Sequence, residues 1–206
     1  MNEKALKTLE YNKIITQLTD LAGSVLGKEL CRNLLPSSDL DTIRLLQKET
    51  SDALKRIYQN GSLSFSGIYD IRGSLKCLEI GSSLGTIELL RICKVLEVCS
   101  RVKAYSNEDL PDSLDEMFDA LQPLTPLSSE IRRCILSEEE ISDDASSALR
   151  QIRRSMKLVH EKIRSQLNSM VNGSSRAYLQ DAVITMRNDR YCIPVKAEYR
   201  GQVPGI

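Results

Sequence analysis

The sequence predicts a mainly α fold in three parts: a multi-helical core, a long projecting helix and a short β-hairpin segment at the C-terminus. Three observations lead to this prediction. Apolar residues recur at close to the 3.6-residue helical period through most of the first 170 positions. Residues 144–171 contain neither Pro nor Gly, so one helix can run through all of them. After Gly173 the pattern changes to two short runs rich in β-branched and aromatic residues.

The core is predicted to contain a series of helices separated by glycine or proline. Each carries an apolar stripe on one side, and most begin at a polar residue that can cap a helix. The expected ranges are 2–22, 24–36, 39–60, 70–81, 86–102, 113–121 and 129–135.

Particular residues are expected to set the ends of these helices. A short polar side chain before an apolar run can accept a hydrogen bond from a free amide of the first turn, and the expected N-caps are Ser24, Asp39 or Asp41, Asp70 and Thr86. Glycine closes helices because it adopts the left-handed conformation easily, and the expected stops are Gly23, Gly61 and Gly81. Pro123 and Pro126 are expected to break the chain ahead of the last short helix.

Residues 144–172 are predicted to form the longest helix, which would span roughly 40 Å at 1.5 Å per residue. An acidic stretch precedes it, which favours a helix N-terminus. Apolar residues follow a seven-residue seam that Gln166 interrupts. The members of the seam are Leu149, Ile152, Met156, Val159, Ile163 and Met170.

A helix with so narrow an apolar seam cannot be buried on all sides, because its remaining faces are charged. We expect an arm that pairs along one stripe with another helix of the chain, a dimer mate or a segment outside this sequence. An ordinary core helix is the alternative.

The C-terminal part is predicted to contain a β-hairpin. Residues 182–187 and 190–195 form two strand-like runs, and Asn188 and Asp189 lie between them. Both residues tolerate positive φ, as a two-residue hairpin turn requires. Pro194 has no amide hydrogen, so it is expected at an edge or at a strand end.

The composition is that of an ordinary folded protein, with 41% hydrophobic and 27% charged residues among 206. It argues against full disorder, and no apolar run approaches the roughly 18 residues of a membrane span. The first residues lack the apolar segment of a secretory signal. The six cysteines form no CxxC motif and are expected to be reduced and half-buried, so we expect a cytoplasmic protein without membrane partners.

No catalytic or metal-binding residue is predicted. Gly23 to Glu29 is a near miss to a phosphate-binding loop, but it has one residue too few between its glycines and a glutamate after Lys28. The only histidine, His160, is expected on a solvated helix face. The clustered carboxylates of residues 138–140 are expected to form a solvated loop before the helix, with cation binding as the alternative. An enzyme built on the carboxylates is a further hypothesis.

The zero net charge conceals an asymmetry. Residues 151–206 carry ten Lys and Arg against four Asp and Glu, so the first 150 residues are acidic by the same margin. Basic groups near the hairpin can neutralise nucleic-acid phosphates, with Tyr191 and Tyr199 between them. The candidate contacts are Arg187, Arg190, Lys196 and Arg200, with Arg153, Arg154 and Arg164 on the long helix behind them. A solvated basic surface is the alternative.

The C-terminal segment resembles the signature of the second bacterial subfamily of MutS proteins (MutS-II). Residues 179–206 carry the most specific match, with the sequence LQDAVITMRNDRYCIPVKAEYRGQVPGI. Further matches lie at residues 6–14, 27–29, 70–72 and 149–154. One departure is Asp189, since a glycine is expected after Asn188; it bears only on the turn type.

The resemblance implies that this chain is the N-terminal core and lever region of a protein several times longer. Members of the family continue into a clamp, a dimerising ABC-type ATPase module that uses ATP and Mg²⁺, and usually an Smr nuclease domain. They are associated with branched-DNA binding, suppression of recombination and, in some bacteria, rescue of collided ribosomes. The implied partners are therefore DNA or the ribosome and its RNA, with homodimerisation through the absent ATPase domain.

The expected division is a helical core at 1–143, a coiled-coil-like lever at 144–172, and the start of a truncated clamp region at 173–206. The chain itself is expected to hold no cofactor and to act as a mechanical part near nucleic acid. The competing hypothesis is a free-standing helical scaffold that dimerises through the seam at residues 149–170.

Overall fold

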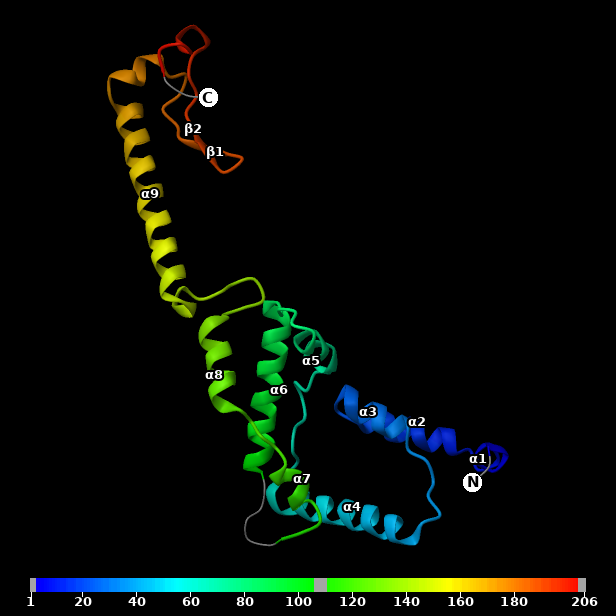
Figure 1. The fold of residues 1–206 in the computed structure, drawn as a ribbon. Coiled ribbons are helices and arrows are strands. Elements are labelled where there is room, and N and C mark those ends of the chain that lie inside the picture. Colours follow the sequence, from blue (N-terminus) through cyan, green and yellow to red (C-terminus); the bar gives the residue numbers. More distant parts are fainter. Residues whose placement is uncertain (1–2, 106–110, 204–206) are drawn as a thin grey trace. The chain divides into compact units, whose positions relative to one another are not determined.

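The computed structural model describes residues 3–105 and 111–203 (Figure 1). The chain divides into two compact units, with the boundary between Ser142 and Asp143. The predicted mainly α fold with a short C-terminal hairpin is confirmed. Positions 2 and 204–206, which entered the predictions, lie outside the described residues.

The first unit is built from helices alone among its described elements. They are α1 (Glu3–Thr8), α2 (Tyr11–Leu21), α3 (Val25–Arg32), α4 (Leu40–Asn60), α5 (Arg72–Glu79), α6 (Thr86–Ala104), α7 (Asp115–Asp119) and α8 (Thr125–Cys134).

The prediction of one continuous first helix is wrong. Glu10 has a φ of 50° and separates α1 from α2. Its side chain pairs with Lys13 at 2.7 Å, inside the first turn of α2. A single left-handed residue does not disturb the apolar period, so the pattern does not reveal this break.

Two of the predicted N-caps are confirmed. The Oγ of Ser24 accepts a hydrogen bond from the amide of Gly27 at 3.0 Å, which places the start of α3 at Val25. Of the two candidates at α4, Asp39 is the cap, and its carboxylate accepts from the amide of Thr42 at 3.2 Å. Gly61, with a φ of 81°, closes α4 as expected.

Thr86 is not the cap of α6, contrary to the prediction. Gly85 occupies that position, and its amide donates to the carboxylate of Glu88 at 2.9 Å. Thr86 is instead the first helical residue, and its hydroxyl donates to the carbonyl of Glu138. Asp70 does accept from the amide of Arg72, at 3.0 Å, although Ile71 is the residue that immediately precedes α5.

Helix α8 begins at Thr125, four residues before the predicted start. Pro126 lies within its first turn, where the amide hydrogen that proline lacks has no partner in the helix anyway. The prediction that Pro126 breaks the chain is therefore wrong, whereas Pro123 does precede the helix. Helix α7 is shorter than the predicted 113–121.

The core of the first unit lies where α6 packs on α8. Cys93 is fully buried there, in contact with Ile92, Ile131 and Ile135. Arg132 of α8 adds an ion pair to Glu97 of α6 at 2.7 Å, at the edge of this contact.

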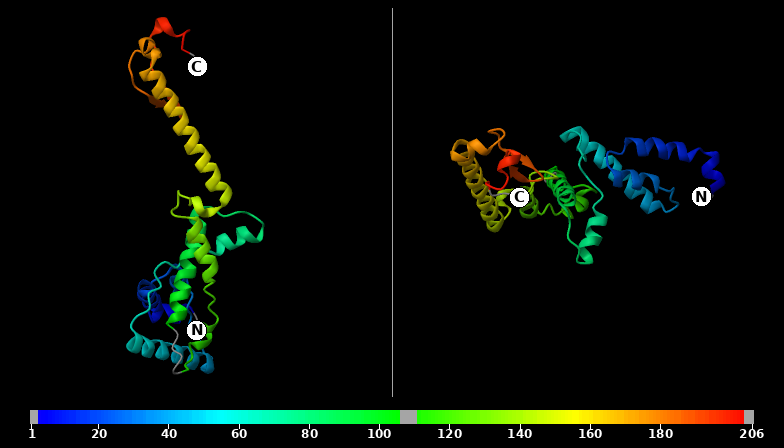
Figure 2. Two further views of the ribbon diagram at one scale, coloured as in Figure 1. Left: turned by 90° about the vertical axis from the view of Figure 1, so that its left-hand side faces the viewer. Right: turned by 90° about the horizontal axis from the view of Figure 1, so that it is seen from above.

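The second unit consists of one long helix with a β-hairpin folded beside its C-terminal part (Figures 1 and 2). Its elements are η1 (Asp143–Ala145), α9 (Ser147–Asn172), η2 (Ser174–Tyr178), β1 (Thr185–Arg187), β2 (Arg190–Cys192) and η3 (Ala197–Tyr199). The hydroxyl of Ser146 caps α9 by accepting from the amide of Leu149 at 3.1 Å, so α9 begins three residues later than predicted.

The hairpin is confirmed, with shorter strands than expected. Asn188 and Asp189 form the turn, with φ values of 47° and 57°. Both values are positive, as in a type I′ turn, whose twist matches the twist of paired strands. Pro194 lies beyond the end of β2, as expected.

The base of the hairpin is tied by a second set of bonds, at residues 178–180 and 194–196. The amide of Gln180 donates to the carbonyl of Pro194 at 2.9 Å, and the amide of Lys196 donates to the carbonyl of Tyr178 at 3.0 Å. Leu179 and Val195 form the β-bridge between these bonds, and Leu179 is buried. These bonds hold residues 178–180 beside residues 194–196, so they determine where the hairpin starts.

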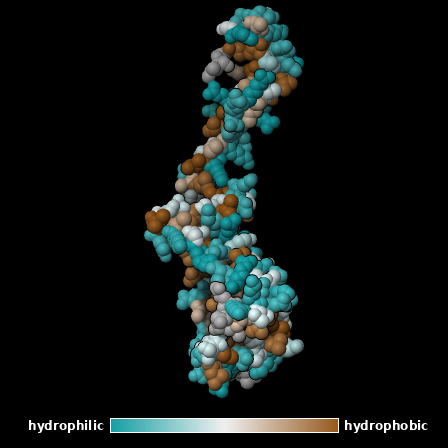
Figure 3. Space-filling view, turned by 90° about the vertical axis from the view of Figure 1, so that its right-hand side faces the viewer, coloured by the Kyte–Doolittle hydropathy of each residue, from teal (hydrophilic) through white to brown (hydrophobic). Residues whose placement is uncertain are grey.

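Apolar side chains remain at the surface of both units (Figure 3). On α9 they include Ile152, Met156 and Val159, each more than half exposed. Ile163 and Met170, further along the same seam, are half-buried. Leu149, at its N-terminal end, is half-buried as well, so the exposed part of the seam is its middle, from Ile152 to Val159.

Candidate nucleic-acid interface

Arg187 and Arg190 meet at the turn of the hairpin. They are partners in the strand register, so their side chains leave the same face of the two-stranded sheet. Both are exposed, and neither makes an ion pair within the described chain. Two like charges directly opposite each other destabilise a strand pair, and a bound anion would relieve the repulsion.

The other face of the hairpin is turned to α9. Met186 and Tyr191 are the next pair in the register, and side chains alternate between the two faces of a strand. The ring of Tyr191 lies 6.0 Å from the ring of His160, edge to face. This contact with α9 directs Arg187 and Arg190 to the opposite, solvent-exposed face.

Arg164 lies on α9 beside the hairpin. It lines a pocket of about 400 Å³ together with Asn168 of the same helix and Met186 and Tyr191 of the hairpin. Its side chain is exposed. The structure thus brings one predicted arginine of the helix to the hairpin that carries two others.

Two of the predicted residues are engaged inside the unit. Arg153 pairs with Asp143 of η1 at 2.5 Å and is half-buried. The ammonium group of Lys196 donates to the carbonyl of Ala177 at 3.0 Å, which caps the end of η2. These contacts give both side chains a structural role.

Arg154 and Arg200 are exposed, the first on α9 and the second just after η3. That any of the seven basic residues contacts phosphate stays a prediction.

The tyrosines do not form a free platform for stacking. Tyr191 packs on His160, and the ring of Tyr199 lies 5.0 Å from the ring of Tyr178. The contact between His160 and Tyr191 is not evident from the sequence, because the two residues are 31 positions apart and no short-range pattern connects them.

Ion pairs with arginine, and in one case a hydrogen bond from serine, keep several acidic side chains of the first unit ionised. Arg132 lowers the pKa of Glu97 to about 2, and Arg72 lowers the pKa of Asp70 to about 2. A hydrogen bond from Ser113, at 2.8 Å, is the main cause that lowers the pKa of Asp52 to about 2. These carboxylates are occupied in internal contacts.

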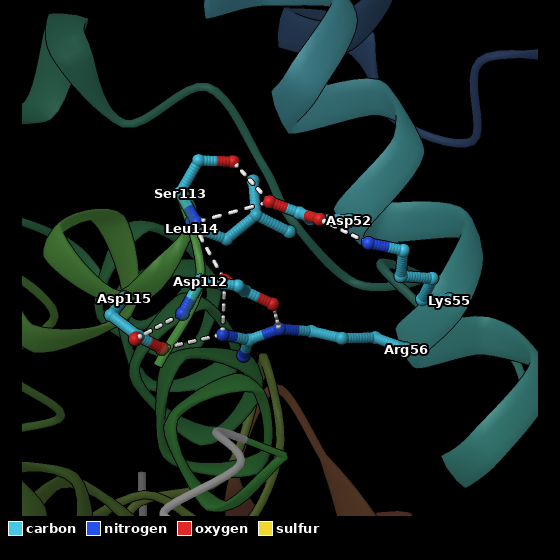
Figure 4. A network of polar contacts seen from close by, with 7 residues as sticks. All are labelled: Asp52, Lys55, Arg56, Asp112, Ser113, Leu114 and Asp115. Atoms are coloured by element: carbon cyan, nitrogen blue, oxygen red, sulfur yellow. Dashed lines mark hydrogen bonds and ion pairs between the residues drawn. The ribbon is translucent and has the colours of Figure 1, made fainter. Parts of the chain in front are cut away.

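The most buried of these contacts centre on Arg56 of α4 (Figure 4). Its guanidinium donates from Nε and Nη2 to the carboxylate of Asp112, both at 2.6 Å, and from Nη2 to Asp115 at 2.5 Å. These bonds join residues 56 and 59 positions apart, so they fix α4 to the segment that leads into α7.

The described residues contain no cluster of three or more His, Cys, Asp or Glu side chains placed to hold a metal ion. Within the same residues, no helix combines the length and the apolar character needed to cross a membrane. The six cysteines are free thiols, of which Cys93 is buried and Cys77 is exposed.

Comparison with known proteins finds close relatives along the entire chain. It is 52% identical to a protein of Lachnoclostridium phytofermentans, 51% identical to one of Agathobacter rectalis and 43% identical to one of Acetivibrio thermocellus, each named Endonuclease MutS2. Each match covers 100% of this chain and 27% of the relative. The chain therefore spans about a quarter of the length of these relatives. No protein-family model matches it.

Proposed function

The chain belongs to the MutS-II family, as its similarity along all 206 residues indicates, and from this premise we propose that it is the helical core and lever part of such a protein. In this proposal the first unit is a rigid base, α9 is the lever, and the hairpin is the first part of a nucleic-acid-gripping clamp. The chain transmits the state of an ATPase module to the clamp, and it performs no catalysis of its own.

The observation that carries the proposal is the opposition of Arg187 and Arg190 across the hairpin. Such a pair is unfavourable in the free chain and favourable next to phosphate oxygens. Arg164 lies on the neighbouring face of α9, and Arg200 is exposed beyond the tied base of the hairpin. We assign phosphate contact first to Arg187 and Arg190, then to Arg164 and Arg200.

The whole protein is proposed to be an ATP- and Mg²⁺-dependent, cytoplasmic homodimer with endonuclease activity in a separate domain. Its relatives carry the name endonuclease, which fits a nucleic-acid substrate. Branched DNA and ribosomal RNA both present phosphate backbones, so the basic hairpin suits either of them.

Charge reversal tests the proposal. The chain carrying Glu at positions 164, 187, 190 and 200 is titrated with a labelled four-way DNA junction and with ribosomes, at several salt concentrations. We expect affinity to fall and the salt slope to decrease by about 0.9 for each lost phosphate contact on duplex DNA. A control variant, Lys48→Glu with Arg101→Glu, reverses two exposed charges of the first unit and is expected to bind as the parent does. Unchanged binding by the hairpin variant contradicts the proposal.

A dimeric scaffold is a second candidate function, favoured by the exposure of Ile152, Met156 and Val159. Sedimentation of the chain over a range of concentrations distinguishes the two functions. A concentration-dependent dimer that Ile152→Glu and Met156→Glu abolish would support the scaffold. A monomer at all concentrations excludes it.

A further inference from the structure

The pocket of about 400 Å³ between α9 and the hairpin lies where the hairpin bulges. The two arms of the hairpin are paired at Gln180 and again at Thr185, so residues 181–184 lie opposite Ile193 alone. A segment with extra residues leaves the ladder of hydrogen bonds. Residues 182–186 line one side of the pocket, and α9 lines the other. The volume is within the range of about 300 to 1,000 Å³ that is typical of small-molecule sites.

The α9 side of the pocket presents polar side chains that a ligand can reach. Arg164, Asn168 and Asn172 are spaced four residues apart, so they share one face of the helix, and all three are exposed. The guanidinium of Arg164 and the side-chain amide of Asn168 form no hydrogen bond or ion pair within the described structure. Asn172 donates one N–H to the carbonyl of Asn168 at 3.0 Å, which leaves its side-chain oxygen available.

The hairpin side combines apolar side chains with unpaired backbone groups. Val183 and Met186 are 46% and 55% exposed. The backbone amides and carbonyls of Val183 and Ile184 form no hydrogen bond with other backbone groups of the described residues, as expected in a bulge. The pocket therefore offers an apolar surface together with donors and acceptors on two sides.

These groups match the parts of one nucleotide. A side-chain amide places a donor and an acceptor side by side, which suits a bidentate bond to the edge of a base. The thioether of Met186 is suited to contact with an aromatic ring. Arg164 is the only charged side chain in the described lining, so it suits a phosphate group. A base whose pairing edge is free to meet the amides is one that has left the duplex stack.

We propose that this pocket takes one unpaired base of a nucleic-acid strand, with Asn168 and Asn172 bound to its pairing edge and Arg164 bound to its phosphate. The inference rests on the proposed function, because it assumes that nucleic acid reaches the hairpin. It adds the recognition of a base to the recognition of phosphates. A surface that binds phosphates alone carries no direct information about the bases.

Four labelled duplexes with the same flanking sequence test the role of the base. They carry a bulged adenosine, a bulged purine nucleoside that lacks the amino group, a bulged abasic site, or no bulge. The abasic bulge keeps the deformability of a bulged duplex, so it separates base binding from shape. Fluorescence anisotropy is expected to show that the adenosine bulge binds about tenfold more tightly than the abasic bulge, with the purine bulge between them. Equal affinity for the adenosine and abasic bulges overturns the proposal.

Two alanine variants of α9 test the location. Asn168→Ala removes an amide of the pocket and is expected to reduce the preference for adenosine over the abasic bulge from about tenfold to about twofold. Gln166→Ala is the matched control, since Gln166 is an exposed amide of the same helix outside the lining, and it is expected to keep the full preference. Alanine is favourable in helices, so both variants are expected to fold. A full preference in Asn168→Ala overturns the assignment of the pocket.

The paired duplex distinguishes failure of this inference from failure of the proposed function. Salt-dependent binding of the paired duplex, without a preference for the adenosine bulge, supports the phosphate contacts and overturns the pocket inference alone. Absence of binding to every duplex overturns both. A DNA set and an RNA set are measured in parallel, and the set with the larger preference identifies the nucleic acid that the pocket takes. Absence of a preference in both sets overturns the inference.

Discussion

Arg187 faces Arg190 across the two-residue turn of the hairpin, with no acidic partner for either side chain among the described residues. The turn between them contains Asp189, which has a φ of 57°. The tip of the hairpin thus combines like-charge repulsion with a conformation that is unfavourable for a residue with a side chain. Both features are open to measurement.

Arg187→Glu is predicted to change stability and binding in opposite directions. The new side chain lies opposite Arg190 and replaces repulsion by attraction, which stabilises the unit by about 0.5 kcal/mol. Binding to a four-way DNA junction is expected to weaken, because one phosphate contact is lost and a repulsive charge is gained. Thermal unfolding and fluorescence anisotropy measure the two effects. A variant that is both less stable and fully competent in binding would contradict the prediction.

Asp189→Gly is predicted to improve both properties. Glycine adopts positive φ without cost from a side chain, which is worth about 0.5 to 1 kcal/mol at such a position. It also removes a negative charge beside the two arginines. Asp189→Asn is the matched variant, since it removes the charge but keeps a side chain on the turn. We expect the two variants to gain similarly in binding, and only Asp189→Gly to gain clearly in unfolding temperature.

Arg56→Leu is predicted to destabilise the first unit by about 3 kcal/mol. The change leaves Asp112 and Asp115 without their cation at a site where the arginine is almost fully buried. Arg72→Leu is the comparison, because the side chain of Arg72 is 58% exposed and its ion pairs lie in water. Its loss is expected to cost less than about 1 kcal/mol. Urea unfolding of both variants gives the two values, and equal losses would show that burial is not the cause.

The stability of the first unit is predicted to fall in acid through Asp52. Hydrogen bonds from Ser113 and Lys55 lower the pKa of Asp52 from about 3.8 to about 2 in the folded chain. The folded state therefore binds this proton less readily than the unfolded state. The contribution is fully present above about pH 4 and is lost as the pH falls through 2.

Asp52→Asn tests this pH dependence. The variant is expected to be less stable than the parent at neutral pH, and the difference is expected to shrink as the pH falls from 4 to 2. Asp41→Asn is the control, since its side chain is 93% exposed and its contact with Arg44 is long, at 3.9 Å. Unfolding monitored by circular dichroism across this range provides the comparison. A difference between Asp52→Asn and the parent that is constant with pH would refute the mechanism.

The predictable parts of the fold depend on residues that are close in the sequence. Ser24 and Asp39 cap helices through bonds to amides three positions away, and Asn188 and Asp189 form the turn between strands that directly follow each other. Each of these caps and turns depends on residues within a few positions of one another, so it can be predicted from the local sequence pattern.

The features that escaped prediction depend on tertiary contacts or on one backbone angle. Glu10 breaks the first helix although the apolar period continues through it. Arg56 is an ordinary charged residue in the sequence, and only folding brings Asp112 to it from 56 positions away. In the candidate interface the composition identified the basic residues, but it could not separate Lys196, which is bound to Ala177, from the exposed Arg187.

The tie at the base of the hairpin determines how mechanical load passes through the second unit. Tension applied beyond Lys196 reaches Tyr178 and then α9 through the bonds between residues 178–180 and 194–196. The loop of residues 181–193 lies outside this path and carries little of the force. Arg187 and Arg190 lie in this loop, so they can change position while the bonds at the base of the hairpin carry the load between α9 and Lys196.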